Sequence, residues 1–194
     1  MAKRYKDIAE NCQIAFNNKF YNKKRKCLYD VLGDSKIRPN QLFALSLTYP
    51  VIDPKSEEAK KLVNTAEKKL LNQYGLKTLA KGEEGYVEVY EGDGFKRDTS
   101  YHQGITWPWL LGLYYNALKN MNKAVKAKKE KQEIQDKIDK FIEKTNKTFN
   151  KELYENGCIG SIAEIYDSSK PQLPKGAFAQ AWSIAEIFRI VLGK

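Results

Sequence analysis

Apolar residues recur at helical spacing over most of the chain, and this periodicity constrains the fold more than any other feature. A helix over residues 56–73 would carry apolar side chains along one face, as an amphipathic helix packed on a core does: Ala59, Leu62, Val63, Ala66 and Leu70. Ser56 stands where an N-cap residue belongs, and Gly75 fits the C-terminal end. Similar patterns predict helices over residues 1–20, 39–47, 107–120, 122–149 and 178–192. The sequence therefore predicts an all-α fold of about six helices with almost no strand.

The first and last of these helices have distinct apolar faces. Over residues 1–20 the face comprises Ile8, Cys12, Ala15, Phe16 and Phe20. In the helix over 178–192 we expect four residues to point inward: Trp182, Ala185, Phe188 and Val191. Both patterns predict packing against a core.

Two long segments interrupt the helical pattern. Residues 80–104 contain five glycines and the alternation Tyr86-Val-Glu-Val-Tyr90, and residues 156–176 contain three glycines and two prolines. Glycine and proline at this density indicate loops, here with one short extended piece. No linker, internal repeat or low-complexity tract divides the chain. With a length of 194 residues, it is predicted to form one domain over residues 1–194.

The net charge of +10 raises the question of a nucleic-acid partner. The excess lies in residues 1–38, with ten basic and four acidic side chains, and in residues 119–151, with eleven and five. There the basic residues alternate with acidic ones along predicted helix surfaces. Solvated helical faces explain this pattern better than a phosphate-binding surface. We therefore expect no nucleic-acid partner.

Several other classes of protein are excluded. The longest apolar runs are too short to span a membrane, and the N-terminus lacks the apolar block of a secretory signal. Three scattered cysteines and a single histidine, His102, make a disulfide framework or a zinc site improbable. Phosphate-binding and dinucleotide-binding glycine motifs are absent. We expect a cytoplasmic protein with reduced thiols, no metal, no cofactor and no membrane contact.

Residues 92–109 form the densest group of polar and aromatic side chains. They combine Arg97, Asp98, His102 and Gln103 with Trp107 and Trp109. Carboxylates, amides and guanidinium groups match the vicinal hydroxyls of a sugar, and indole rings pack on its C–H faces. Alternatively, the tryptophans are ordinary core residues and the Arg97–Asp98 pair is an ordinary ion pair.

Two further segments carry candidate residues. Glu164 lies between Ala163 and Ile165, where a partly desolvated carboxylate would suit proton transfer; the alternative is a solvent-facing glutamate at a loop edge. Asn40 and Gln41 precede an apolar helix. Helix capping is the default role for such residues, and a position facing a pocket is the alternative.

The stretches Tyr-His-Gln-Gly-Ile-Thr-Trp-Pro-Trp-Leu-Leu-Gly (101–112) and Gly-Cys-Ile-Gly-Ser-Ile-Ala-Glu-Ile-Tyr-Asp (157–167) resemble the C-terminal region of glycogen debranching enzymes. That region is the amylo-α-1,6-glucosidase. Three shorter pieces agree in order and spacing: residues 37–41, 74–79 and 179–186. The resemblance covers nearly the whole chain.

The resemblance implies a fold and an activity. The family fold is an (α/α)6 toroid of paired helices with the sugar site in the loops at one end. The family removes the α-1,6-linked glucose at branch points of glycogen-type α-glucan, with inversion. Glu164 would be the general base. The residues expected at sugar subsites are Arg38, Asn40, Asp98, Tyr101, His102, Gln103 and Trp107.

One departure from the family pattern concerns the general acid. In the family the acid is an aspartate in a Thr-Trp-Met-Asp type motif, upstream of the matched region, and this sequence has none. About six helices are also half of the family's twelve. We therefore expect the C-terminal half of a toroid, incomplete at its N-terminal side and weak or inactive alone. The hypotheses are a debranching glucosidase region, a split enzyme completed by a separately encoded N-terminal half, or a non-catalytic sugar-binding scaffold.

Overall fold

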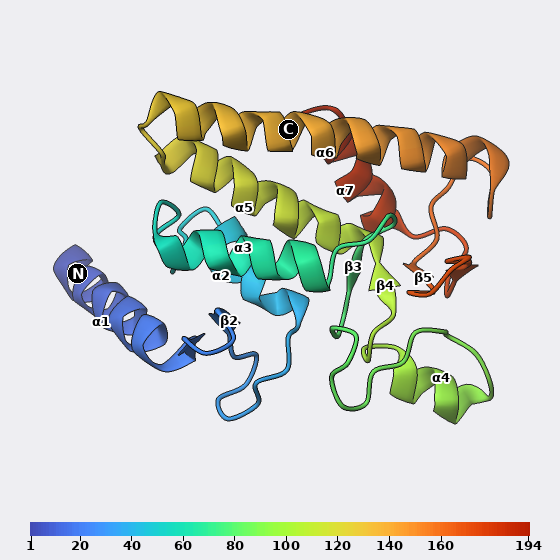
Figure 1. Ribbon diagram of the computed structural model, residues 1–194, viewed down its shortest axis with the longest axis horizontal. Helices are drawn as coiled ribbons and strands as arrows, with labels where there is room; N and C mark the ends of the chain where they lie inside the picture. The colour runs from blue at the N-terminus through green and yellow to red at the C-terminus, as the bar shows by residue number, and fades with distance from the viewer.

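The computed structural model describes residues 1–194 and is mostly helical, as predicted (Figure 1). Its seven α-helices are α1 (Ala2–Phe20), α2 (Phe43–Ser46), α3 (Glu57–Lys69), α4 (Gly94–Ser100), α5 (Leu111–Ala124), α6 (Lys128–Glu155) and α7 (Ala181–Val191). Two short 3-10 helices, η1 (Pro39–Leu42) and η2 (Pro108–Leu110), lead into α2 and α5. The assembly of these helices into part of a toroid stays a prediction, as does the domain boundary.

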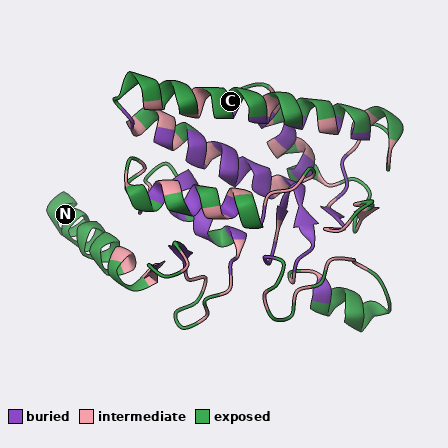
Figure 2. Cartoon of the chain, in the orientation of Figure 1, coloured by how far each residue is buried: buried purple, intermediate pink, exposed green.

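Helix α5 forms the centre of the core. It packs against α2, α3, α6 and α7, and Figure 2 shows most of it buried. Eight of its fourteen residues are buried, as is typical of a helix that packs against several others. Tyr114 and Tyr115, both nearly inaccessible, contact Phe141 of α6 with ring centroids 5.0 and 6.5 Å apart.

Helix α3 confirms the sequence pattern in detail. Ser56 caps it by accepting a hydrogen bond from the Ala59 amide at 3.1 Å, and the predicted apolar face is buried. The helix ends at Lys69 rather than near residue 73. The prediction for Gly75 was wrong, because this residue lies beyond the helix and against the neighbouring strand instead.

Helix α7 contradicts the predicted inward face. Its buried residues are Ser183, Ile187 and Ile190, whereas Trp182 and Phe188 are about half exposed. Apolar side chains occupy both faces of this helix, so periodicity alone cannot select the one that packs on α5 and α6. Ala185 is also exposed and Val191 is only partly buried.

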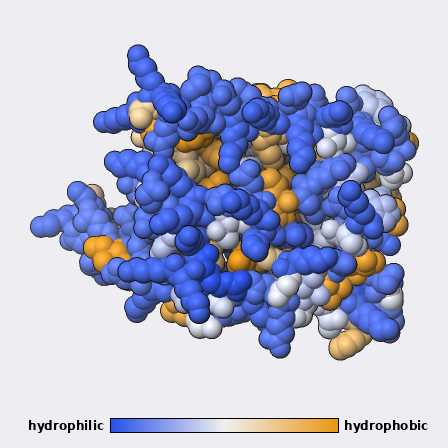
Figure 3. All heavy atoms as spheres, in the orientation of Figure 1, coloured by the Kyte–Doolittle hydropathy of each residue, from blue (hydrophilic) through white to orange (hydrophobic).

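Helix α1 forms as predicted but buries none of its residues. It projects from the rest of the molecule (Figure 1) and touches it mainly near its C-terminal end. There Phe16 and Phe20 stack on each other, and the amides of Gln13 and Asn17 donate to the carbonyl of Val51. Ile8 and Ile14 remain more than half exposed, and Figure 3 shows apolar surface on this projecting part.

The loops contain more regular structure than the sequence predicts. Residues 94–100 form α4, capped by Asp93 at the Lys96 amide, and the alternation at 86–90 forms no strand. Six two-residue strands build two antiparallel sheets. The first pairs β1 (Tyr21–Asn22) with β2 (Cys27–Leu28), and the second has the order β3 (Leu76–Lys77), β4 (Thr106–Trp107), β5 (Ile165–Tyr166), β6 (Pro174–Lys175).

The four-stranded sheet links segments that are far apart in the sequence. Thr106 pairs with Tyr166 in register, and its hydroxyl receives a hydrogen bond from Asn72 at 2.6 Å. On the Tyr166 side of this pair, Tyr74 stacks on Tyr166 with ring centroids 4.3 Å apart. The Tyr166 hydroxyl donates to the buried Glu152 carboxylate at 3.0 Å. Burial, followed by the nearby Glu152, raises the pKa of Tyr74 to about 12.

No helix has both the length and the apolar character that crossing a bilayer requires.

Replacing Gly75 with alanine tests the close approach of β3 to β4. A Cβ at Gly75 would collide with the main-chain carbonyl of Trp107, and main chain inside a sheet yields less readily than a side chain. We expect a loss of about 1–3 kcal/mol in the free energy of unfolding, measured by denaturant titration. Gly94→Ala is the control, because its Cβ would enter open space at the first residue of α4. Equal stability of the two variants would contradict the packing described.

Candidate active site

A cavity of about 710 Å3 lies where η1, η2, the turn at residues 101–103 and the start of α7 meet. Aromatic, amide, guanidinium and carboxylate side chains line it together. The lining residues are Asp30, Val31, Asp34, Arg38, Pro39, Asn40, Thr78, Tyr101, His102, Gln103, Trp107, Trp109, Leu110 and Trp182. A concave site of this size with apolar walls and a few polar groups is typical of small-molecule binding.

All three tryptophans gather at this cavity. The ring centroid of Trp182 lies 6.0 Å from that of Trp107 and 5.9 Å from that of Trp109. Tyr101 contacts Trp107 edge-on at 4.7 Å, and the Trp107 indole N–H donates to the Tyr101 carbonyl at 3.2 Å. These rings give the cavity a rigid apolar wall, which suits the C–H face of a sugar.

Arg38 connects the walls of the cavity. Its Nη1 donates to the carbonyls of His102 at 2.8 Å and Thr78 at 3.1 Å, and its Nη2 donates to Gln103 Oε1 at 3.0 Å. A planar guanidinium can hold several acceptors in fixed directions. Arg38 therefore fixes the turn that carries Tyr101, His102 and Gln103.

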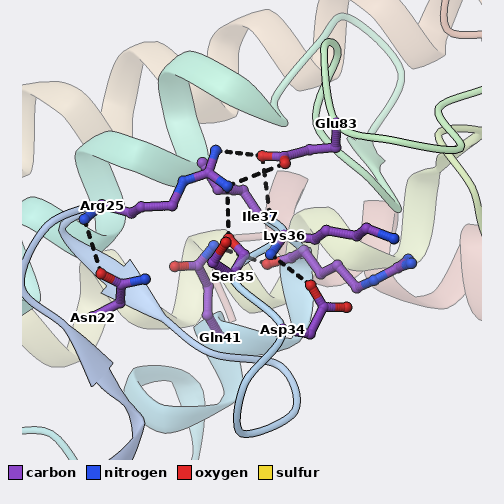
Figure 4. Close-up of polar contacts among 9 residues, drawn as sticks. Asn22, Arg25, Asp34, Ser35, Lys36, Ile37, Gln41 and Glu83 are labelled. Atoms are coloured by element: carbon purple, nitrogen blue, oxygen red, sulfur yellow. Dashed lines mark hydrogen bonds and ion pairs between the residues drawn. The ribbon is translucent and has the colours of Figure 1, made fainter.

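The loop before Arg38 is held from its other side by Arg25 and Glu83 (Figure 4). Arg25 Nη1 donates to Glu83 Oε2 at 3.1 Å and to the Ser35 carbonyl at 2.8 Å, and the Ile37 amide donates to Glu83 Oε1 at 3.4 Å. The hydrogen bond with Glu83 raises the pKa of Arg25. This network fixes the segment whose Asp34 and Arg38 face the cavity.

Glu164 lies beside the cavity wall, immediately before β5. Its Oε1 accepts from Gln180 Nε2 at 3.1 Å, and its Oε2 accepts from the Ala177 amide at 3.2 Å. A side chain at Gly176, where φ is +69°, would collide with this carboxylate. Burial and the adjacent Glu164 carboxylate raise the pKa of Tyr101, which places Glu164 next to a lining residue.

The comparison with known families agrees with this geometry. A family model described as amylo-alpha-1,6-glucosidase matches residues 1–189. The chain belongs to this family. The match confirms the resemblance to the C-terminal region of debranching enzymes that the motifs at 101–112 and 157–167 suggested.

The structure of this amylo-alpha-1,6-glucosidase family member brings most of the predicted site residues together. The six that line the cavity are Arg38, Asn40, Tyr101, His102, Gln103 and Trp107. Asn40 makes no capping bond at the start of η1, which leaves its amide free toward the cavity. Glu164 lies adjacent to this group rather than in its lining. The roles assigned to all these residues stay predictions.

Asp98 is the one predicted residue that lies apart from the cavity. It is exposed on α4 and is absent from the lining. The other expectation for Asp98, an ion pair with Arg97, is not met either. Arg97 donates instead to the Gly92 carbonyl at 3.0 Å.

Among the lining residues that the sequence motifs did not assign to the site are two carboxylates and a tryptophan. Asp30 and Asp34 face it from the loop before η1, and Trp182 faces it from α7. The position of Asp30 after Leu28-Tyr29 was visible in the sequence, but nothing in its spacing links it to residues 101–107. Trp182 was assigned to the core because the wrong face of α7 was chosen. No three histidine, cysteine or carboxylate side chains lie close enough together to hold a metal ion.

The single histidine offers a direct test of the site's electrostatics. Burial, and then the Arg38 guanidinium, lower the pKa of His102, while Glu164 opposes them. We expect NMR titration of the imidazole to give a pKa below its usual value of about 6.5. Arg38→Gln should raise this pKa part of the way back, whereas Arg97→Gln, which alters an exposed arginine, should leave it unchanged.

The same shift predicts a pH dependence of stability. Because the folded state holds the His102 proton more weakly than the unfolded state, the unfolded chain binds more protons near and below pH 6.5. The contribution of His102 to the free energy of unfolding should therefore fall as the pH drops through that range. A wild-type pKa at or above 6.5 would contradict both expectations.

Proposed function

We propose that this chain is a cytoplasmic α-glucan-binding glycoside hydrolase region that acts on α-1,6-linked glucose at branch points, with inversion. The observation that carries the proposal is the tryptophan-lined cavity with Glu164 beside it, in a chain of the amylo-alpha-1,6-glucosidase family. Branched α-glucan, such as glycogen or a limit dextrin, is the proposed ligand.

Glu164 is the proposed general base. Inversion requires one carboxylate to activate a water and a carboxylic acid roughly 6.5–9.5 Å away to protonate the leaving oxygen. The bonds from Gln180 and Ala177 orient the Glu164 carboxylate through one lone pair on each oxygen. Since a carboxylate offers about four acceptor positions, others remain free for a water.

The general acid is proposed to come from a separate N-terminal half. The family's acidic motif is absent from this sequence. On the projecting helix α1, Tyr5, Ile8 and Ile14 are more than half exposed, and contiguous exposed apolar surface is typical of a face that another element covers.

A non-catalytic sugar-binding scaffold is the second candidate. One observation favours it: Glu164 lies beside the cavity rather than among its lining residues. This candidate requires glucan binding but no contribution of Glu164 to turnover in any assembly.

The first test measures glucose release from a branched limit dextrin. We expect no release by this chain alone, because general acid catalysis is typically worth about 10²–10⁴-fold. With an N-terminal half that carries the acidic motif, release should appear and should vanish in Glu164→Gln. Turnover by the chain alone would overturn the split assignment and would direct attention to Asp30 and Asp34 as acids. Activity of the assembly that survives Glu164→Gln would refute the base assignment.

The second test measures binding of a branched oligosaccharide by calorimetry. Trp182→Ala should weaken binding by about tenfold, the equivalent of about 1.4 kcal/mol of lost stacking. Trp182 is preferable to the nearly buried Trp107, whose truncation would also damage the core. Phe188→Ala is the matched control, since Phe188 is equally exposed on α7 but lies outside the cavity. Equal affinities of the two variants would argue against the tryptophan wall as the binding surface.

A further inference from the structure

A second cavity, of about 610 Å3, lies between α3 and the turn that joins β1 to β2. It shares no lining residue with the tryptophan-lined cavity. Four basic side chains line it and no carboxylate does, so we call it the basic cavity: Lys24, Arg25, Lys68 and Lys69. Positive charge gathered in a concave space favours an anionic ligand.

Three of these four cations have no acidic partner. The ammonium groups of Lys24, Lys68 and Lys69 form no ion pair in the chain, whereas Arg25 is paired with Glu83. Lysines in the last turn of a helix offset its dipole, which accounts for Lys68 and Lys69 at the end of α3. That role does not account for Lys24, which comes from a different segment. Because like charges around one space repel each other, a bound anion would relieve the repulsion.

Hydrogen bonds hold the walls of the basic cavity in place without using its lysine ammonium groups. The buried Asn22 carboxamide accepts from the main-chain amides of Lys24 and Arg25, each at 3.1 Å, and Figure 4 shows the second of these bonds. The Thr65 hydroxyl of α3 donates to the Lys26 carbonyl at 3.1 Å, which joins the turn to the helix. A cavity with fixed walls pays less of the ordering cost of binding.

The lining matches a phosphate ester of a small hydroxyl-rich molecule. A phosphomonoester carries a charge of about −1.5 to −2 at neutral pH and three acceptor oxygens, and ammonium groups from two walls can bond to it together. Tyr29, Ser35 and Asn64 add hydroxyl and amide groups to the lining, which can bond to the hydroxyls of the organic part. The volume is within the range of small-molecule sites.

A nucleic acid matches this charge pattern less well. Phosphates repeat along a strand, so a strand requires cations over an extended surface. Beyond the basic cavity, acidic side chains interrupt the basic surface. Lys60 of α3 pairs with Glu57 and Glu130 at 2.8 and 2.7 Å, and Lys6 of α1 pairs with Glu10 at 3.8 Å.

We propose that the basic cavity binds a small hydroxyl-rich phosphomonoester, such as a hexose phosphate. Lys24 on one wall and the two lysines of α3 on the other contact the phosphate oxygens. The site is separate from the tryptophan-lined cavity, so this proposal does not rest on the proposed function. Residues 34–38 lie between the two sites, with Ser35 in the lining of one and Arg38 in the lining of the other.

Methyl NMR during a titration with glucose 6-phosphate at low ionic strength tests the location and the ligand class. Thr65 and Ile37 line the basic cavity, whereas Leu110 lines the tryptophan-lined one. We expect saturable shifts at Thr65 and Ile37, none there with glucose, and at least about tenfold weaker binding of gluconate, which carries a single carboxylate. Shifts confined to Leu110, no shifts at all, or equal affinities for gluconate and glucose 6-phosphate would overturn the proposal.

A pair of double variants separates a site from general charge attraction. Lys24→Gln combined with Lys69→Gln should lower the affinity for glucose 6-phosphate by about tenfold or more, since each removes a charge-assisted hydrogen bond. Lys3→Gln combined with Lys61→Gln is the control, because it removes the same net charge outside the cavity lining. All four lysines are exposed, so both variants should keep the fold. Equal losses in the two variants would overturn the site. Tighter binding of a short single-stranded RNA, lost in the first variant alone, would replace the small ligand with a nucleic acid.

Discussion

The pairing of β4 with β5 is the constraint on which the rest of the site depends. Two long loops run through the interior of a helical chain, and their backbone amides and carbonyls must find partners there. They find them in each other, through two-residue strands centred on the Thr106–Tyr166 pair. Because Trp107 follows one partner and Glu164 precedes the other by two residues, this pairing sets the tryptophan wall beside the carboxylate. The stacked Tyr74 and the buried Glu152 support the sheet from below.

The charged groups of the site also follow from which hydrogen bonds form. Arg38 donates to two carbonyls and to the Gln103 amide oxygen, so it joins two segments of the chain and forms no ion pair. The carboxylates around the cavity consequently keep acceptor capacity. Asp30 is unpaired, Asp34 accepts only from the Lys36 amide, and Glu164 accepts one bond on each oxygen. A neutral ligand rich in hydroxyl groups can use all of these acceptors, whereas an anion would meet three carboxylates.

The longer helices were predicted because each carries its own apolar periodicity, and α3 carries a cap as well. Ser56 and the apolar face of α3 are local features, and so are the prolines that open η1 and η2. Six of the residues that the motifs and the resemblance singled out line one cavity, and their roles there stay predictions. The failures involve non-local choices. The buried face of α7 is set by packing against α5 and α6, and the two-residue strands β4 and β5 form by pairing across about 60 residues of sequence. The position of Asp34 depends on the Arg25–Glu83 network, which holds Ser35 and Ile37.

In the proposed function, binding and catalysis depend on different groups of the cavity. Every aromatic ring, amide and guanidinium group of the cavity comes from residues 30–182 of a single chain, and most are fixed by bonds that need no further element. The proposed recognition of a sugar therefore depends on residues that this fold already brings together. In the proposed mechanism, inverting hydrolysis requires in addition a proton donor on the opposite side of the scissile bond from Glu164, and the Thr-Trp-Met-Asp motif that the resemblance implies for this donor is absent from the sequence. The proposal therefore expects glucan affinity and turnover to respond to different substitutions.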